Sequence, residues 1–190
     1  MVSEILDLMR VWIEQIILAL GYPGIALMML AENLFPPIPS ELVMPFAGFL
    51  AARGQLNLAG VLIAGSLGSL AGAWALYAAG GWLGERAVRP LIRSYGRWLL
   101  LTEADLDRAL RVFAQHGRLA VFVGRLMPLI RSLISLPAGL NGMRLRLFLP
   151  LTLAGTLLWN SLMAGAGYLL GARWDELLVF TKQYERGVLV

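Results

Sequence analysis

Four ionisable residues lie inside long apolar stretches of this chain, and their chemistry suits the handling of an anion. Two are acids, Glu32 and Glu41, and two are arginines, Arg125 and Arg131. An unpaired charge at the centre of a membrane helix costs about 2.5–3.5 kcal/mol, so four of them would cost about 10–14 kcal/mol. We therefore expect the acids and arginines to pair, to contact water or to hold a charged ligand.

The two arginines favour a phosphate as that ligand. A guanidinium group is a planar fork that matches phosphate oxygens, and Ser132 adds a hydroxyl beside Arg131. Broken helices nearby would offer free N–H groups and positive dipole ends to an anion. Burial favours the neutral form of a carboxyl group, so Glu32 and Glu41 could carry a proton. A purely structural ion-pair lock is the alternative interpretation.

A proline-rich break separates the two acids. It holds three prolines, Pro36, Pro37 and Pro39. Proline cannot continue a preceding helix, and it pushes the residue before it out of the helical region. The uncharged arms on either side are about 10 residues each, roughly 15 Å, which is half of a hydrocarbon core of about 30 Å. We expect a re-entrant hairpin over residues 24–52; the alternative is an ordinary surface loop.

A second broken stretch, residues 119–142, repeats this pattern with the sign of the charge reversed. Its breaks are expected at Pro128 and Pro137. An uncharged segment long enough to cross a membrane follows each hairpin, at residues 58–83 and at residues 147–170. Because one crossing separates the hairpins, they should enter from opposite faces. The expected fold is an all-α membrane protein built as an inverted repeat of two re-entrant broken-helix hairpins, each followed by a transmembrane helix.

Composition agrees with a single membrane domain over residues 1–190. Hydrophobic residues make up 58% of the chain and charged residues 15%, against about 25% charged in a soluble domain. The chain has no cysteine and one histidine, which excludes thiolate chemistry and a histidine-rich metal site, and no cofactor is expected. In such a chain the net charge of +4 points to anionic lipid rather than to nucleic acid.

Polar segments frame the expected hairpins. Residues 1–20 predict an amphipathic interfacial helix whose apolar face includes Trp12, Ile16 and Ala19. Residues 85–118 form an arginine-rich segment with a second amphipathic helix, which ends at His116. The positive-inside rule places this segment in the cytoplasm and both termini outside.

The two broken stretches resemble the signatures of the DedA family of bacterial membrane proteins, which are related to the VTT-domain proteins of eukaryotes. The first resemblance is the pattern Glu-x-x-Phe-Pro-Pro-x-Pro-Ser-Glu at residues 32–41. The second comprises Gly124, Arg125, Pro128, Arg131, Ala138, Gly139, Met143, Phe148, Trp159, Gly167, Tyr168 and Gly171. Leu129 departs from the second signature, since the family commonly has a glycine after the proline.

The resemblance implies a transporter of the bacterial cytoplasmic membrane, not an enzyme. Its implied substrate is a lipid phosphate such as undecaprenyl phosphate, moved in dependence on the proton-motive force. It also implies that Glu32, Glu41, Arg125 and Arg131 are essential. The alternatives are an uncoupled phospholipid scramblase, a proton-coupled ion or drug antiporter, a lipid phosphatase and a structural partner-binding protein. A monomer and a homodimer both remain open.

Overall fold

The protein is all-helical wherever its structure is described. The computed structural model describes residues 12–35, 40–95, 102–127 and 130–172. Residues 12–20 are helical, and the further helices are α2 (Tyr22–Leu34), α3 (Ser40–Ala52), α4 (Leu58–Tyr95), α5 (Glu103–Gly124), α6 (Ile130–Leu133), α7 (Ser135–Leu140) and α8 (Leu145–Ala172). The predicted all-α class is confirmed for these residues.

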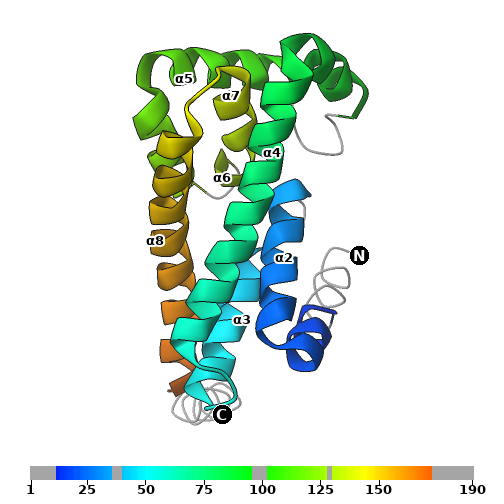
Figure 1. Cartoon of the computed structure of the whole chain (residues 1–190). Coiled ribbons are helices and arrows are strands. Elements are labelled where there is room, and N and C mark those ends of the chain that lie inside the picture. The colour runs from blue at the N-terminus through cyan, green and yellow to red at the C-terminus, as the bar shows by residue number, and fades with distance from the viewer. Residues whose placement is uncertain (1–11, 36–39, 96–101, 128–129, 173–190) are drawn as a thin grey trace, which may run out of the picture.

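Two long apolar helices run along the length of the molecule (Figure 1). Leu58–Pro90 within α4 has 33 residues and Leu145–Gly171 within α8 has 27. Each exceeds the roughly 20 residues needed to cross a hydrocarbon core, so the two predicted long apolar helices are confirmed. Directly after the expected end at residue 83, Gly84 interrupts the helical conformation with φ 67° and ψ 171°, and a second helical segment of α4 continues to Tyr95. Glycine tolerates this conformation because it has no Cβ.

The first expected hairpin corresponds to α2 and α3. Helix α2 ends at Leu34, and Phe35 is extended, with φ −129° and ψ 87°. Its N–H still donates to the Ala31 carbonyl at 2.7 Å, which closes the last turn. The three prolines expected to form the break, Pro36, Pro37 and Pro39, lie outside the described residues.

The second expected hairpin begins inside α5 and continues through α6 and α7. His116, with φ −135° and ψ 33°, marks a kink where two helical segments join within α5. Pro128 lies outside the described residues. Pro137, where the second break was expected, lies in the first turn of α7, just after the turn at Ile134 that separates α6 from α7. The first N–H groups of a helix have no intrahelical acceptor, so proline removes no bond there.

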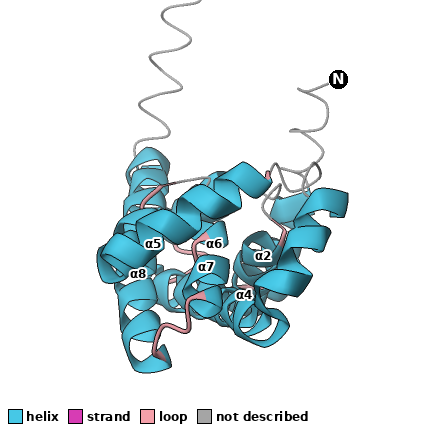
Figure 2. Ribbon diagram, turned by 90° about the horizontal axis from the view of Figure 1, so that it is seen from above, coloured by secondary structure: helices cyan, strands magenta, loops and turns pink. Residues whose placement is uncertain are grey.

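The shorter helices pack against both long helices. Helices α2 and α7 pack against α4, whereas α3 and α5 pack against α8. Seen from above, α6 and α7 lie between α5 and α8 on one side and α2 and α4 on the other (Figure 2). Small residues allow these backbones to approach closely. A Cβ added at Gly139 of α7 would lie 2.0 Å from the Tyr77 carbonyl oxygen of α4.

Gly167 makes the corresponding approach between α8 and α3, and it supports a first prediction. A Cβ there would lie 1.9 Å from the Pro45 carbonyl oxygen, whereas one at Gly165 would have no heavy atom within 4 Å. We expect Gly167→Ala to destabilise the protein by about 1–3 kcal/mol through overpacking. Gly165→Ala should be neutral or stabilising by up to about 1 kcal/mol. Thermal unfolding of both variants in detergent tests this, and equal melting temperatures would contradict it.

Ion pairs fasten the start of α5 to the end of α4. Arg93 Nε donates to Glu103 Oε1 at 2.7 Å, and Arg89 Nη2 donates to Asp107 Oδ1 at 2.6 Å. The hydrogen bond from Arg93 holds the pKa of Glu103 below its usual range. Leu106 is buried beside Val88 in the same corner. The corner therefore fixes where α5 starts its return toward α8.

The N-terminal segment faces the bundle with a different set of residues from the one expected. Within residues 12–20, Ile13 and Ile17 are buried, whereas Trp12 and Ala19 are exposed. The two buried isoleucines join a core formed mainly by α2, α3 and α4. The exposed tryptophan remains compatible with a position at the membrane interface.

Candidate functional site

A buried ion pair joins the two broken stretches. Glu32 lies in the last turn of α2 and Arg131 lies in α6. Arg131 Nη2 and Glu32 Oε1 are 2.7 Å apart, and the two side chains are only 7% and 4% exposed. The structure thus brings together an acid and an arginine that are far apart in the sequence. A pair this deeply buried needs additional hydrogen bonds to offset the loss of water from both charges.

Neighbouring polar groups supply those hydrogen bonds. Ser132 Oγ donates to Glu32 Oε1 at 2.9 Å. Asn33 Nδ2 donates to Glu32 Oε2 at 3.2 Å. Both carboxylate oxygens of Glu32 therefore accept hydrogen bonds within a site closed to solvent.

Arg125 lies in the same cluster but has neutral partners. Its Nη1 donates to Asn33 Oδ1 at 2.9 Å, and its Nη2 donates to Ser135 Oγ at 2.6 Å. Its buried Nε has no hydrogen-bond acceptor in the part of the chain that the structure describes. Asn33 consequently links Arg125 to Glu32. With two guanidinium groups and one carboxylate, the buried cluster has a formal excess of one positive charge, which favours an anion.

A small cavity lies between the two arginines. Its volume is about 10 Å³, and its lining residues are Asn33, Ser69, Arg125, Arg131, Thr156 and Trp159. This volume holds about one water molecule. A phosphate group with its oxygens is larger, so it could occupy this space only after the surrounding helices move apart.

Trp159 packs against one of the arginines and supports a second prediction. The Arg131 Cζ atom lies 5.6 Å from the centroid of the Trp159 ring. A desolvated cation–π contact of this kind is worth about 2 kcal/mol. We expect Trp159→Leu to lower the free energy of unfolding by about that amount and Trp159→Phe to lower it less, because phenylalanine keeps a ring. Trp74→Leu, at a 53% exposed position of α4, is the control; an equal effect there would contradict the prediction.

The cluster lies near the middle of both long helices. A Cβ added at Gly155 would lie 2.7 Å from the Cβ of Arg125. Gly155 stands ten positions after Leu145, roughly 15 Å along α8, which is half of a core of about 30 Å. Ser69, which lines the cavity, stands eleven positions after Leu58, roughly 16 Å along α4. Both helices therefore place the cluster near the midplane of a membrane that they cross.

Glu41, which the sequence analysis placed with the site residues, lies apart from this cluster. Glu41 is exposed in the first turn of α3. It still lies close enough to Glu32 for the two negative charges to repel each other. Glu32, Arg125, Arg131 and Ser132 come together, whereas Glu41 remains at the edge.

Sequence reasoning found Ser132 but assigned no role in the site to three other neutral members of the cluster. Asn33 and Ser135 bind Arg125, and Trp159 contacts Arg131. One signal could have identified Asn33, because an amide inside an apolar run needs partners when it is buried. Ser135 had no comparable signal, whereas Trp159 belongs to the second family signature, which did not assign it a contact with Arg131.

Comparisons with known proteins place the chain among bacterial membrane proteins. The sequence model of the VTT domain family matches residues 38–169 of this chain. The "Alkaline phosphatase-like protein" of Lactococcus lactis subsp. cremoris is 39% identical over 93% of this chain and 83% of its own length. "Undecaprenyl phosphate transporter A" of Staphylococcus aureus is 32% identical over 92% of this chain and 86% of its own length. "Inner membrane protein YghB" of Escherichia coli is 28% identical, over 86% and 71%. No solved structure matches the chain significantly.

These relatives and the two long apolar helices confirm the expected location. The chain is a multi-pass protein of the bacterial cytoplasmic membrane. The names of the relatives point to two kinds of chemistry, a phosphatase-like one and lipid phosphate transport. Within the described ranges, no three side chains of His, Cys, Asp or Glu gather as they would around a metal ion.

Proposed function

Because this chain belongs to the VTT-domain family of the DedA/SNARE-associated superfamily, we propose that it carries a phosphate-bearing lipid across the bacterial cytoplasmic membrane. Undecaprenyl phosphate is the proposed substrate, as the name of the Staphylococcus aureus relative suggests for that protein. We propose that transport depends on the proton-motive force and that the protein does not act as an enzyme.

The observation that carries this proposal is the positive excess of the buried cluster. Among the described residues, Arg125 donates to two neutral oxygen atoms, those of Asn33 and Ser135. A phosphate oxygen is a stronger acceptor than either, because it carries negative charge and a phosphate can accept two parallel hydrogen bonds from one guanidinium group. Arg125 is therefore the proposed receptor of the phosphate within the buried cluster, and the lipid tail stays in the bilayer.

Arg131 would bind the phosphate only after its ion pair with Glu32 has broken. A proton on Glu32 removes the carboxylate charge and so weakens its bond to the Arg131 guanidinium. The released guanidinium and the Ser132 hydroxyl could then bind the phosphate beside Arg125. Glu41, exposed near Glu32, is the proposed donor or acceptor of that proton. This exchange would couple the proton to the lipid.

The packing of the helices supports the proposed inverted repeat. One helix from each broken stretch packs on α4, namely α2 and α7, and one from each packs on α8, namely α3 and α5. In each half of the chain, one short helix packs on the long helix of its own half (α2 on α4, α5 on α8) and one packs on the long helix of the other half (α3 on α8, α7 on α4). Helices α2 and α3 have 13 residues each, roughly 20 Å, which is too short for a core of about 30 Å. We therefore keep two re-entrant hairpins of opposite direction as part of the proposal.

Leaflet exchange in proteoliposomes tests the proposed function. The purified protein would be reconstituted with labelled undecaprenyl phosphate, with and without an imposed pH gradient. Undecaprenol, which lacks the phosphate, is the matched control lipid, and the doubly neutral variant Glu32→Gln/Arg131→Gln is the matched control protein. We expect gradient-dependent transfer of the phosphate lipid alone, lost in the double variant.

Other outcomes would favour the alternatives. Equal exchange of ordinary phospholipids without any effect of the gradient would indicate an uncoupled scramblase. Proton flux coupled to small ions or drugs, without lipid transfer, would indicate an antiporter. Release of inorganic phosphate from the lipid would indicate a phosphatase, as the name of the Lactococcus lactis relative suggests for that protein. A folded protein with none of these activities would leave a partner-binding role.

A further inference from the structure

A second, more open pocket lies at one end of the bundle, away from the buried arginine cluster. Its volume is about 480 Å³, and it is lined by Phe113, Ala114, Gly117, Arg118, Asn141, Met143, Arg144 and Leu147. These residues come from α5, from the turn after α7 and from the start of α8. We call it the outer pocket. Its size is within the range of pockets that bind small molecules, about 300–1,000 Å³.

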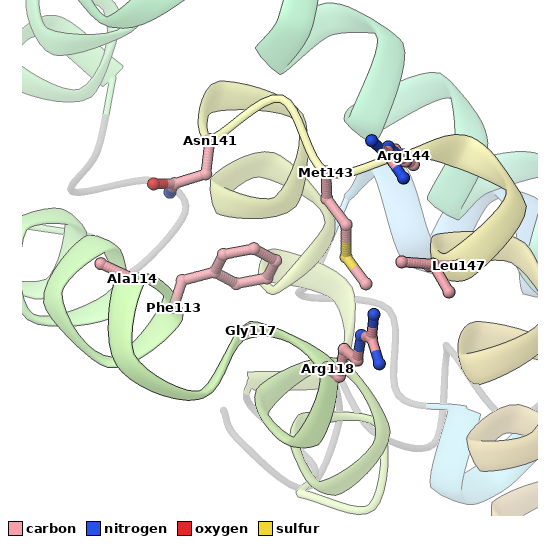
Figure 3. Close-up of a pocket in the computed structure, with 8 residues that line it drawn as sticks. All are labelled: Phe113, Ala114, Gly117, Arg118, Asn141, Met143, Arg144 and Leu147. Carbon is pink, nitrogen blue, oxygen red and sulfur yellow. The ribbon is translucent and has the colours of Figure 1, made fainter.

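The outer pocket combines positive charge with an apolar floor. Figure 3 shows the Phe113 ring and the Met143 side chain extending toward its middle, with Arg118 and Arg144 nearer its edges. Both arginines are exposed, and neither forms an ion pair with the described part of the chain. Two cations without acidic partners attract an anion, whereas the floor suits a hydrocarbon. A ligand that satisfies both is an anionic head group attached to an apolar chain.

The depth of the outer pocket agrees with a lipid head group. Tyr77 of α4 donates a hydrogen bond to the carbonyl oxygen of Met143. Tyr77 stands 19 positions after Leu58, roughly 28 Å along α4, which is close to the far boundary of a core of about 30 Å. The span in α8 begins at Leu145, beside the pocket. Both long helices thus place the outer pocket at the boundary between the hydrocarbon core and the head groups.

Helix α5 connects the outer pocket to the buried cluster. Arg118 lies in α5 and Arg125 directly follows its last residue, with an N–H that still donates to the Val121 carbonyl, so seven helical positions separate them by about 10 Å along the helix axis. We propose that the outer pocket binds the phosphate head group of a prenyl monophosphate before that group passes to Arg125. The identity of this lipid rests on the proposed function; the anionic, amphipathic character of the ligand rests on the pocket itself.

Photocrosslinking tests this binding site without any measurement of transport. The full-length protein would be placed in nanodiscs of phosphatidylcholine and titrated with a prenyl monophosphate that carries a diazirine on its first isoprene unit. Mass spectrometry would map and quantify labelled peptides that contain residues 113–118 and 141–147. We expect saturable labelling there, displaced by unlabelled prenyl monophosphate but not by the corresponding prenyl alcohol.

A matched pair of double variants isolates the two arginines of the pocket. Arg118→Gln/Arg144→Gln should raise the half-saturating concentration about 30-fold, about fivefold for each direct contact between an exposed arginine and the anion that is lost. Arg111→Gln/Arg146→Gln removes the same charge from α5 and from the start of α8, at exposed positions that do not line the pocket. This control should label like the wild type. Equal weakening in both double variants would show general electrostatic attraction and overturn the proposed site.

The remaining outcomes distinguish the outer pocket from the proposed function. Labelling that persists in Arg125→Gln supports an outer site separate from the buried cluster. Displacement by inorganic phosphate as effective as by the lipid would overturn the lipid assignment. If the pocket is labelled but proteoliposomes transfer no lipid, the proposed function fails and the site stands. If lipid is transferred without saturable labelling of the pocket, the inference fails and the function stands.

Discussion

Replacing Glu32 by alanine should destabilise the protein by about 3–5 kcal/mol, because it leaves the buried Arg131 guanidinium without its carboxylate. Their charged atoms are 2.7 Å apart, and both side chains are almost completely buried. Removing one member of such a pair is far more harmful than removing both, since the remaining charge has neither water nor a counterion. The same change would also remove an acceptor from Ser132 and from Asn33.

Chemical unfolding in detergent micelles, followed by circular dichroism, measures this effect. Glu41→Ala is the matched control, because Glu41 is an exposed acid across the same break, and we expect a change within about 0.5 kcal/mol. Glu32→Gln/Arg131→Gln should recover most of the lost stability, because two neutral amide side chains can bond to each other. A single Glu32→Ala variant as stable as the wild type would show that the pair contributes no net stabilisation.

Arg125→Lys should lower the rate of lipid phosphate transfer by roughly 10- to 100-fold, although it keeps the positive charge. Each hydrogen bond to a charged group contributes about 1.5–3 kcal/mol. The guanidinium reaches Asn33 and Ser135 through two separate nitrogens, and its Nε is left over for a further acceptor. A lysine ammonium is a compact point charge on a flexible stem, so it cannot reproduce this planar arrangement.

Transfer of labelled undecaprenyl phosphate in proteoliposomes measures the loss, and size-exclusion chromatography of the variant shows whether it remains folded. Arg146→Lys, at an exposed position near the start of α8, is the control and should transfer at the wild-type rate. A fully active Arg125→Lys variant would favour the antiporter alternative, in which the carboxylates do the chemistry and the arginines are structural. Loss of activity together with loss of folding would require Arg125→Gln for comparison.

The location of the candidate site could be predicted because charges inside apolar runs are costly in a membrane. Glu32, Arg125 and Arg131 stood out on this ground alone, and the structure brings all three together. The neutral partners could not be predicted in the same way. Asn33 and Ser135 act through the direction of single hydrogen bonds, which depends on how the helices are rotated about their axes.

The sequence by itself determined the class of the protein, its two long apolar helices and the end of α2 before the prolines. These features depend on local quantities, namely the length of an apolar run and the backbone limits of proline. Pro137 lies in the first turn of α7, a position where proline removes no helical hydrogen bond. The interruptions at Gly84 and His116 lie next to residue 83 and at His116, where the sequence predicted the apolar span and the amphipathic helix to end.

Only the tertiary structure decided which charges meet. The sequence offered two acids and two arginines, and either acid could have paired with either arginine. The structure pairs Glu32 with Arg131, gives Arg125 neutral partners and leaves Glu41 exposed. The physical reason is that an ion pair requires charged atoms within about 4 Å. Positions on that scale are set by the packing of α2, α5 and α6 against one another, not by spacing along the chain.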